Sequence, residues 1–225
     1  MKRFVEEEHG QEVRISTDGI TLEGTLVVPE HASGLVIFAH GSGSSRHSIR
    51  NRFVAGFLNQ HSLGTLLFDL LSEQEERLDL RTAKLRFDIE FLAGRLRSVM
   101  EWVSENTDVS HLNTGLFGSS TGAAAALVAA AEQQDVKAVV SRGGRPDLAG
   151  DALKSVKAPT LLIVGGDDTL VIQLNEDAQR QLRCVNELQI IPHATHLFEE
   201  PGTLETVAQL AADWFGQHLS PEQQH

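Results

Sequence analysis

The residues best suited to chemistry lie in the segment Gly118-Ser119-Ser120-Thr121-Gly122. Two glycines flank Ser120 at a distance of two residues, which is the G-x-S-x-G pattern of a nucleophile elbow. There a sharp turn pushes the serine hydroxyl outward, and a side chain at either glycine would collide with the turn. An unrelated glycine-serine turn would seldom fall between an apolar run and an alanine-rich segment. The motif therefore predicts a strand, a turn and a helix, with Ser120 as a nucleophile.

A serine nucleophile needs a histidine base, and that histidine needs a carboxylate to orient it. In this architecture they follow in the order serine, acid, histidine. Asp167 and Asp168 follow the apolar run 159–164, and His196 follows the apolar run 187–191. Because parallel strands end at one edge of their sheet, these groups are expected to meet Ser120 there, with Asp168 the stronger candidate for the acid.

A metal site is the alternative for this region, because His193, His196, Glu199 and Glu200 lie close together in the sequence. The H-x-x-H spacing on a loop lacks the helical i, i+4 arrangement that aims two rings at one ion. We therefore expect no metal and no cofactor. His40 is interpreted as a residue that fixes a loop through hydrogen bonds, not as a base.

Apolar runs alternate with longer amphipathic segments, which is typical of an α/β protein. Runs that are apolar throughout indicate parallel strands covered on both faces, and Asp18-Gly19 indicates an antiparallel hairpin at the start. The sequence thus predicts a mostly parallel, doubly wound sheet of about eight strands. Strands are expected at 12–17, 20–28, 34–39, 65–70, 114–117, 136–140, 159–164 and 187–191. Helices are expected at 49–59, 87–104, 121–133, 147–153, 171–182 and 203–217.

Length and composition narrow the class of protein. The 225 residues fit a single domain over 1–225, with a disordered tail at 221–225, a charged loop at 72–88 and no cap domain between 144 and 159. A net charge of -12 argues against a nucleic-acid partner. No apolar run approaches the roughly 20 residues that span a membrane. The single cysteine and the lack of a signal sequence predict a cytoplasmic location.

The motifs resemble those of the α/β-hydrolase superfamily from residue 34 to the last helix. The resemblance implies that the acid stands in a G-x-x-D-x-x-V setting, which Gly165, Asp168 and Val171 match, and that His196 is the histidine before the last helix. The segment 39–43 looks like the superfamily's H-G-x loop. This implies an oxyanion hole formed by the backbone N–H groups of Ser42 and Thr121, so that their side chains matter less.

Within the superfamily the short chain looks most like the dienelactone-hydrolase-like branch, including small hydrolase units that some bacterial chains carry beside a phosphoribosyltransferase. Dienelactone hydrolases use cysteine at the elbow, whereas this chain has Ser120, and Cys184 lies outside any elbow. A lactone substrate is therefore not implied. The expectation is a carboxylesterase-like serine hydrolase acting on a small ester or thioester. A serine peptidase, an acyltransferase and a noncatalytic binding protein on the same scaffold remain alternatives.

Substrate should bind just beyond the carboxyl ends of the strands. The candidates there are Leu71, Arg142, Leu170, Leu197 and Phe198. Several arginines border the same edge, and two interpretations are open. They pair with nearby glutamates, or some face the open site and favour acyl groups that bear a carboxylate. The arginines are Arg46, Arg50, Arg52, Arg142 and Arg145, and the glutamates are Glu73, Glu75 and Glu76.

Overall fold

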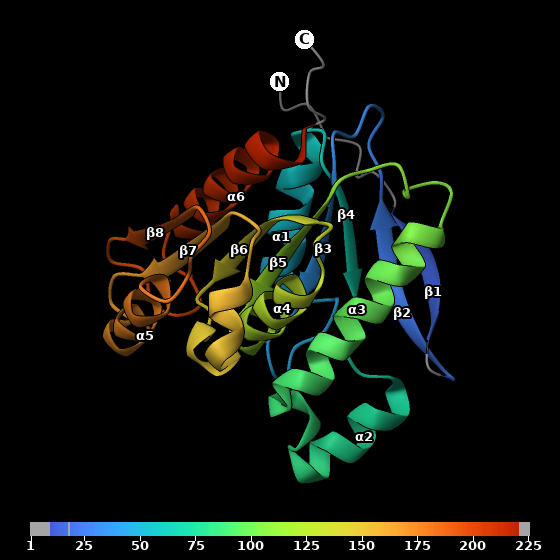
Figure 1. Cartoon of the computed structure of the whole chain (residues 1–225), viewed down its shortest axis with the longest axis horizontal. Helices are drawn as coiled ribbons and strands as arrows, with labels where there is room; N and C mark the ends of the chain where they lie inside the picture. Colours follow the sequence, from blue (N-terminus) through green and yellow to red (C-terminus); the bar gives the residue numbers. More distant parts are fainter. Residues whose placement is uncertain (1–9, 18, 221–225) are drawn as a thin grey trace.

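The computed structural model describes residues 10–17 and 19–220, so the expected tail 221–225 lies outside the described residues. The described chain contains one eight-stranded sheet in the order β1-β2-β4-β3-β5-β6-β7-β8 (Figure 1). Strands β3 to β8 run parallel, whereas β2 pairs antiparallel with both β1 and β4. The predicted architecture is therefore confirmed. The strands are β1 Gln11–Thr17, β2 Ile20–Val27, β3 Leu35–Ala39, β4 Gly64–Phe68, β5 Thr114–Ser119, β6 Val136–Arg142, β7 Thr160–Gly165 and β8 Asn186–Ile191.

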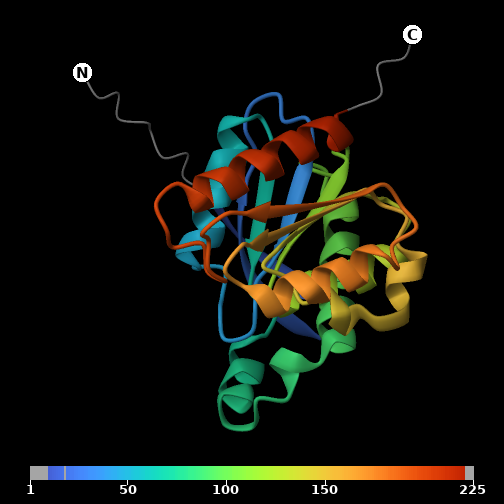
Figure 2. The same cartoon turned by 90° about the vertical axis from the view of Figure 1, so that its left-hand side faces the viewer.

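Helices cover both faces of this sheet (Figure 2). Helices α1 and α6 pack on one face, and α3, α4 and α5 lie on the other. Every residue of β3, β4 and β7 is buried, which explains why these strands are almost entirely apolar instead of alternating. The helices are α1 Ile49–Gln60, α2 Glu73–Thr82, α3 Ile89–Glu105, α4 Thr121–Glu132, α5 Thr169–Gln179 and α6 Thr203–Leu219, with short 3-10 helices η1 Leu85–Phe87 and η2 Pro146–Ser155.

The segment 72–88 differs from the charged loop that we expected, because most of it is helical. Ser72 begins α2 with a capping box, in which its hydroxyl accepts from the Glu75 N–H while the Glu75 carboxylate accepts from the Ser72 N–H. Glu73 and Arg77 then form an ion pair one turn apart. The Ser-x-x-Glu spacing is the signal that could have revealed this helix. Helix α2 projects beyond the end of β4 (Figure 1).

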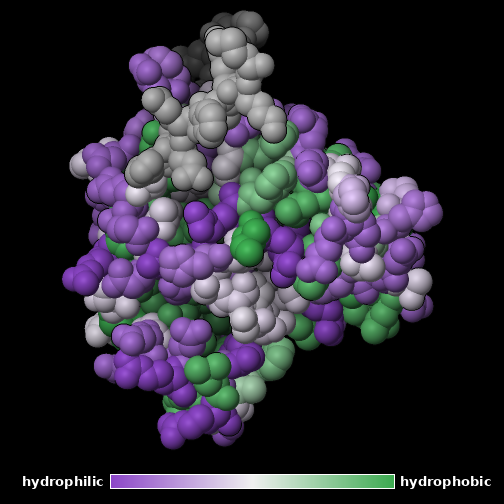
Figure 3. Space-filling view, turned by 180° about the vertical axis from the view of Figure 1, so that it is seen from behind, coloured by the Kyte–Doolittle hydropathy of each residue, from purple (hydrophilic) through white to green (hydrophobic). Residues whose placement is uncertain are grey.

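Between β6 and β7 the chain forms only η2, so no cap domain is inserted there. None of the described helices is long and apolar enough to cross a membrane. On the face seen in Figure 3, hydrophilic residues predominate and apolar residues occur in small groups. Because no cap domain is inserted, the edge at which β3 to β8 end is bordered by loops and by α2.

Candidate active site

Ser120 occupies a strained turn between β5 and α4. Its backbone angles are φ 51 and ψ -122, a conformation that costs a residue other than glycine about 1–3 kcal/mol. The flanking glycines make the turn possible. A Cβ at Gly118 would lie 2.4 Å from Cα of Ala123, and one at Gly122 would lie 2.3 Å from the carbonyl oxygen of Ala39. The G-x-S-x-G spacing is therefore required by close backbone packing.

The backbone of Ser120 is tied down while its hydroxyl is not. The Ser120 N–H donates to the Arg142 carbonyl at 3.3 Å, and the Arg145 N–H donates to the Ser120 carbonyl at 3.1 Å. Ser120 stands at the N-cap position of α4, yet its side chain makes no capping hydrogen bond. The fold thus fixes the position of the half-buried hydroxyl, although this hydroxyl does not cap the helix.

His196 is held by Asp168. The Nδ1 atom of His196 lies 2.6 Å from Oδ2 of Asp168, whereas Asp167 is exposed and contacts Ala194 through its backbone N–H. Asp168 is the N-cap residue of α5, but its side chain does not cap the helix. With Nδ1–H directed at the carboxylate, Nε2 is left free to accept a proton.

Gly143 connects the histidine to the elbow. It follows the last residue of β6, Arg142, whose carbonyl accepts the Ser120 N–H. A Cβ on Gly143 would lie 3.1 Å from the His196 carbonyl oxygen and 3.6 Å from Cε1 of its ring, and the φ of Gly143 is +50. Ser120 and His196 therefore lie on either side of one short backbone segment at the carboxyl edge of the sheet.

The loop after β3 reaches the same place. A Cβ at Gly41 would lie 3.1 Å from Cβ of Ser120. The next N–H, that of Ser42, donates to the Thr121 hydroxyl oxygen at 2.9 Å. The two residues expected to form an oxyanion hole are thus in contact. The Thr121 side chain takes part in that contact, which the sequence gave no signal to expect.

His40 fixes this loop, in agreement with its interpretation from sequence. Its Nδ1–H donates to the Gly41 carbonyl at 3.0 Å, and its Nε2 accepts the Leu70 N–H at 3.0 Å. Both ring nitrogens are occupied, and the ring is buried. Burial lowers the pKa of His40 below 6.5. The neutral imidazole is therefore a structural link between the ends of β3 and β4.

This burial makes stability depend on pH. At pH values between the lowered pKa of His40 and 6.5, the unfolded chain binds more protons than the folded chain. The contribution of neutral His40 to the free energy of unfolding is therefore fully present above pH 6.5 and is lost as the pH falls below that value. We expect His40→Gln, which keeps a donor and an acceptor, to reduce this loss. His218, whose pKa burial also lowers, leaves part of the slope in place. Urea unfolding between about pH 7 and pH 5.5 measures the slopes, and equal slopes for the two proteins would contradict the assignment.

The five expected substrate-binding residues fall into two groups. Leu71 lines a cavity of about 150 Å³ between the 41–45 loop and α2, and Leu170 and Leu197 are exposed near the same edge. Phe198 and Arg142 are only 2% and 6% exposed. The expectation that these two side chains line the opening is wrong, because Phe198 packs into the core between the sheet, α1 and α6 and Arg142 lies beneath it.

The arginines do not pair with the glutamates that we expected. Glu73 and Glu75 bind arginines of α2 and α3 instead, because α2 turns them toward those partners. Arg46, Arg50 and Arg145 form ion pairs with other carboxylates that lie close to them in space. The pairs are Arg46 with Asp69 and Glu12, Arg50 with Glu199, Arg145 with Asp147, Glu73 with Arg77, and Glu75 with Arg95.

Arg52 and Arg142 have no described carboxylate within ion-pair distance, and Arg52 is exposed whereas Arg142 is buried. The Arg142 side chain is held inside the protein by other contacts. Its guanidinium donates to Oδ1 of Asn51 at 3.3 Å and lies 6.0 Å from the centre of the Phe198 ring. Ser119 donates to the same Asn51 oxygen at 3.4 Å. Burial, together with the charge of Arg50, lowers the pKa of Arg142 to about 10. Arg142 thus joins α1 to the strand ends beside the elbow.

The Arg142 guanidinium is buried and bonded to Asn51, so it is not placed to contact a substrate. We therefore expect Arg142→Met to change kcat/KM by the same factor for an anionic ester and for a neutral ester of equal size. Steady-state kinetics on such a pair measure the two factors. A rise in KM for the anionic ester alone, which shrinks when salt is added, would show instead that Arg142 contacts substrate.

The residues of the alternative metal site do not converge. His196 is bonded to Asp168, Glu199 pairs with Arg50, and Glu200 accepts hydrogen bonds from Thr195. Among the residues that the structure describes, no group of three histidine, cysteine or acidic side chains is placed to hold a metal ion.

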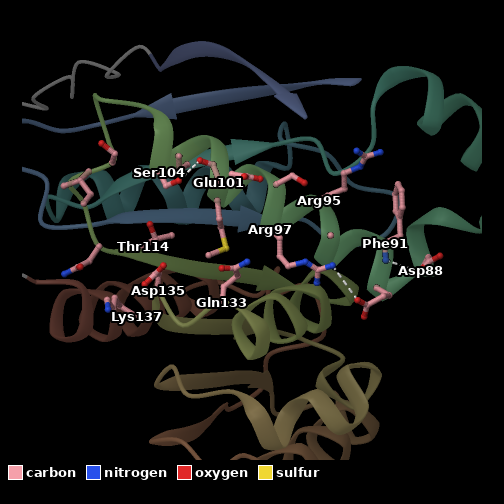
Figure 4. Close-up of a pocket in the computed structure, with 18 residues that line it drawn as sticks. Asp88, Phe91, Arg95, Arg97, Glu101, Ser104, Thr114, Gln133, Asp135 and Lys137 are labelled. Atoms are coloured by element: carbon pink, nitrogen blue, oxygen red, sulfur yellow. Dashed lines mark hydrogen bonds and ion pairs between the residues drawn. The ribbon is translucent and has the colours of Figure 1, made fainter. Parts of the chain in front are cut away.

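A larger groove, of about 1380 Å³, runs along α3 (Figure 4). Its walls include Thr114 and Lys137, at the starts of β5 and β6, whereas Ser120 follows the end of β5. The groove therefore follows the outer side of α3 and reaches the edge of the sheet opposite Ser120, and Ser120 is not among its lining residues. Its labelled residues are Asp88, Phe91, Arg95, Arg97, Glu101, Ser104, Thr114, Gln133, Asp135 and Lys137.

An eight-stranded, mostly parallel sheet whose fifth strand ends in this elbow is the fold of an α/β hydrolase. Residues 68–219 match the model of the dienelactone hydrolase family. The chain belongs to that family and has the α/β-hydrolase fold.

Similar proteins are known from several bacteria. Dienelactone hydrolase from Anabaena variabilis, known from a crystal structure, shares 59% sequence identity with this chain. The two structures match with a TM-score of 0.92, and the match covers 94% of this chain and 99% of the other. Est1E from Butyrivibrio proteoclasticus shares the fold at 18% identity, with a TM-score of 0.77 over 92% and 98% of the two chains. A Mycobacterium tuberculosis protein provisionally named phosphoribosyl transferase is 57% identical over 210 residues. These cover 93% of this chain, which spans 46% of the length of that relative.

Proposed function

We propose that the protein is a serine hydrolase that cleaves a small ester or thioester through an acyl-Ser120 intermediate, with His196 as the base and Asp168 as its partner. The observation that carries this proposal is the bond of 2.6 Å between His196 and Asp168, at the edge where Ser120 is held in its strained turn. Neither Ser120 nor Asp168 uses its side chain to cap the helix that it begins. Both side chains are therefore available for the reaction.

The reaction follows from these positions. The Ser120 oxygen attacks the substrate carbonyl carbon while His196 takes the serine proton on Nε2, and Asp168 stabilises the imidazolium. The negative charge on the carbonyl oxygen falls near the start of α4, where backbone N–H groups and the helix dipole favour it. Collapse of the tetrahedral intermediate expels the alcohol or thiol, which takes the proton from His196. Water then attacks the acyl-serine with the same base, and the acid is released.

The cavity beside the 41–45 loop supports a small acyl group. It measures about 150 Å³, and Leu70, Leu71, Leu80 and Leu92 contribute apolar side chains to its lining. The loop that borders it contacts Ser120 through Gly41. An acyl chain bound to Ser120 would enter this space, so short acyl chains are expected to react faster than long ones.

The name of the mycobacterial relative is not carried over to this chain. The chain spans 46% of the length of that protein, so a name given to the whole protein does not establish the activity of the part that matches this chain. The residues that its fold gathers at the carboxyl edge of the sheet suit acyl transfer to serine.

Labelling with a fluorophosphonate tests the proposal. We expect one equivalent of label, located by mass spectrometry on the peptide that contains Ser120, and turnover of short acyl esters or thioesters. An unlabelled and inactive protein would favour the noncatalytic binding protein on this scaffold. Labelling accompanied by cleavage of peptides, or by transfer of the acyl group to an added alcohol in place of water, would favour the peptidase or the acyltransferase.

A further inference from the structure

The hydrogen bond between Ser42 and Thr121 changes the expected oxyanion hole. A backbone N–H can donate only one good hydrogen bond, and that of Ser42 is directed at the Thr121 hydroxyl oxygen at 2.9 Å. Thr121 is 4% exposed and follows Ser120 directly. The N–H that would bind an oxyanion is therefore occupied by a side chain at the site itself.

The chemistry of the hydroxyl fixes what it can do next. A threonine hydroxyl has one hydrogen to donate and two lone pairs to accept. Since an N–H group cannot accept, the Thr121 oxygen is the acceptor in the bond with Ser42 and keeps its own hydrogen. No residue in the described part of the chain accepts a hydrogen bond from that hydroxyl. The hydroxyl is thus a buried donor without a partner, one residue from Ser120.

We propose that the Thr121 hydroxyl, and not the Ser42 N–H, is the second donor to the oxyanion, beside the backbone N–H of Thr121. This inference rests on the proposed acyl-serine chemistry. The Ser42 N–H polarises the hydroxyl by donating to it, because hydrogen bonds in a chain strengthen one another. Both Thr121 donors stand at the first residue of α4, where the helix dipole favours negative charge.

Two substitutions separate the hydroxyl from the shape of the side chain. Thr121→Val keeps the size and loses the hydroxyl, and Thr121→Ser keeps the hydroxyl and loses a methyl group. Loss of one oxyanion-hole donor lowers kcat on the order of 10²- to 10³-fold, so we expect this for the valine variant, with little change in KM. The serine variant is expected to stay close to wild type. A trifluoromethyl ketone, which forms a tetrahedral adduct with serine, should lose affinity for the valine variant by a similar factor.

The opposite result is equally clear. If the Ser42 N–H is the true donor and the hydroxyl only occupies it, Thr121→Val frees that N–H, and kcat stays the same or rises. Equal losses in both variants, with lowered melting temperatures, would assign Thr121 a packing role. Either result overturns the inference while fluorophosphonate labelling of the wild-type protein stands. A wild-type protein that takes no label would instead refute the proposed function itself.

Discussion

Replacing Ser120 with alanine is expected to abolish turnover and covalent labelling while the fold is kept. Loss of the nucleophile from a serine triad lowers kcat on the order of 10⁶-fold. The fold should persist because the Ser120 hydroxyl makes no capping bond and the turn is held by backbone contacts to Arg142 and Arg145. Ester hydrolysis, intact-protein mass spectrometry after labelling and the melting temperature measure the three outcomes.

Ser119 provides the matched control, one residue away. Its hydroxyl donates to Asn51 inside the protein, so Ser119→Ala is expected to cost about 1 kcal/mol of stability and to leave labelling intact. If Ser120→Ala keeps more than about a tenth of wild-type activity, the large fall in kcat that loss of a nucleophile causes has not occurred. Ser120 is then not the nucleophile.

The second large effect is expected at Asp168. Asparagine in place of Asp168 would present an amide to Nδ1 of His196 and favour the wrong tautomer, leaving Nε2 protonated and unable to act as a base. The corresponding change in a serine protease triad lowers kcat by about 10⁴-fold, and we expect a loss of that order here. The pH dependence of kcat/KM measures the change in the base directly.

Asp167 tests whether this loss is specific. It is adjacent and carries the same charge, but its side chain is exposed and only its backbone N–H contacts the histidine loop. Asp167→Asn should therefore change kcat by less than about threefold, in line with a substitution on the surface. Equal losses in the two variants, or a larger loss for Asp167→Asn, would reject the alignment of Gly165, Asp168 and Val171 with the superfamily motif.

The elbow and the strand pattern could be predicted because their causes are local. Gly118 and Gly122 are required because a Cβ at either position would lie only 2.4 or 2.3 Å from neighbouring backbone atoms, and only glycine avoids this clash. The apolar runs of β3 and β7 reflect burial on both faces, which any parallel sheet imposes on its strands. Signals of this kind are carried by each segment alone.

Helix α2 shows where local information was present and was outweighed. The capping box at Ser72 and Glu75 marks the start of a helix, but the density of charge around it favoured a loop. The charges are explained by ion pairs on the helix and with its neighbours, including Asp79, buried against Arg86, and Glu75, bound to Arg95 of α3. The second pair joins residues 20 positions apart, which no local pattern specifies.

By itself the sequence determined the class of fold, the order of serine, acid and histidine, and the edge at which they gather, because chain order and strand direction decide these. Only the tertiary structure decided that Arg142 and Phe198 are buried and that Thr121 occupies the Ser42 N–H. These contacts join loops that lie far apart in the chain, 79 residues in the case of Ser42 and Thr121. The geometry of these contacts depends on how the starts of α1 and α4 pack against the ends of β3, β5 and β6. Residue types and their spacing along the chain do not specify this packing.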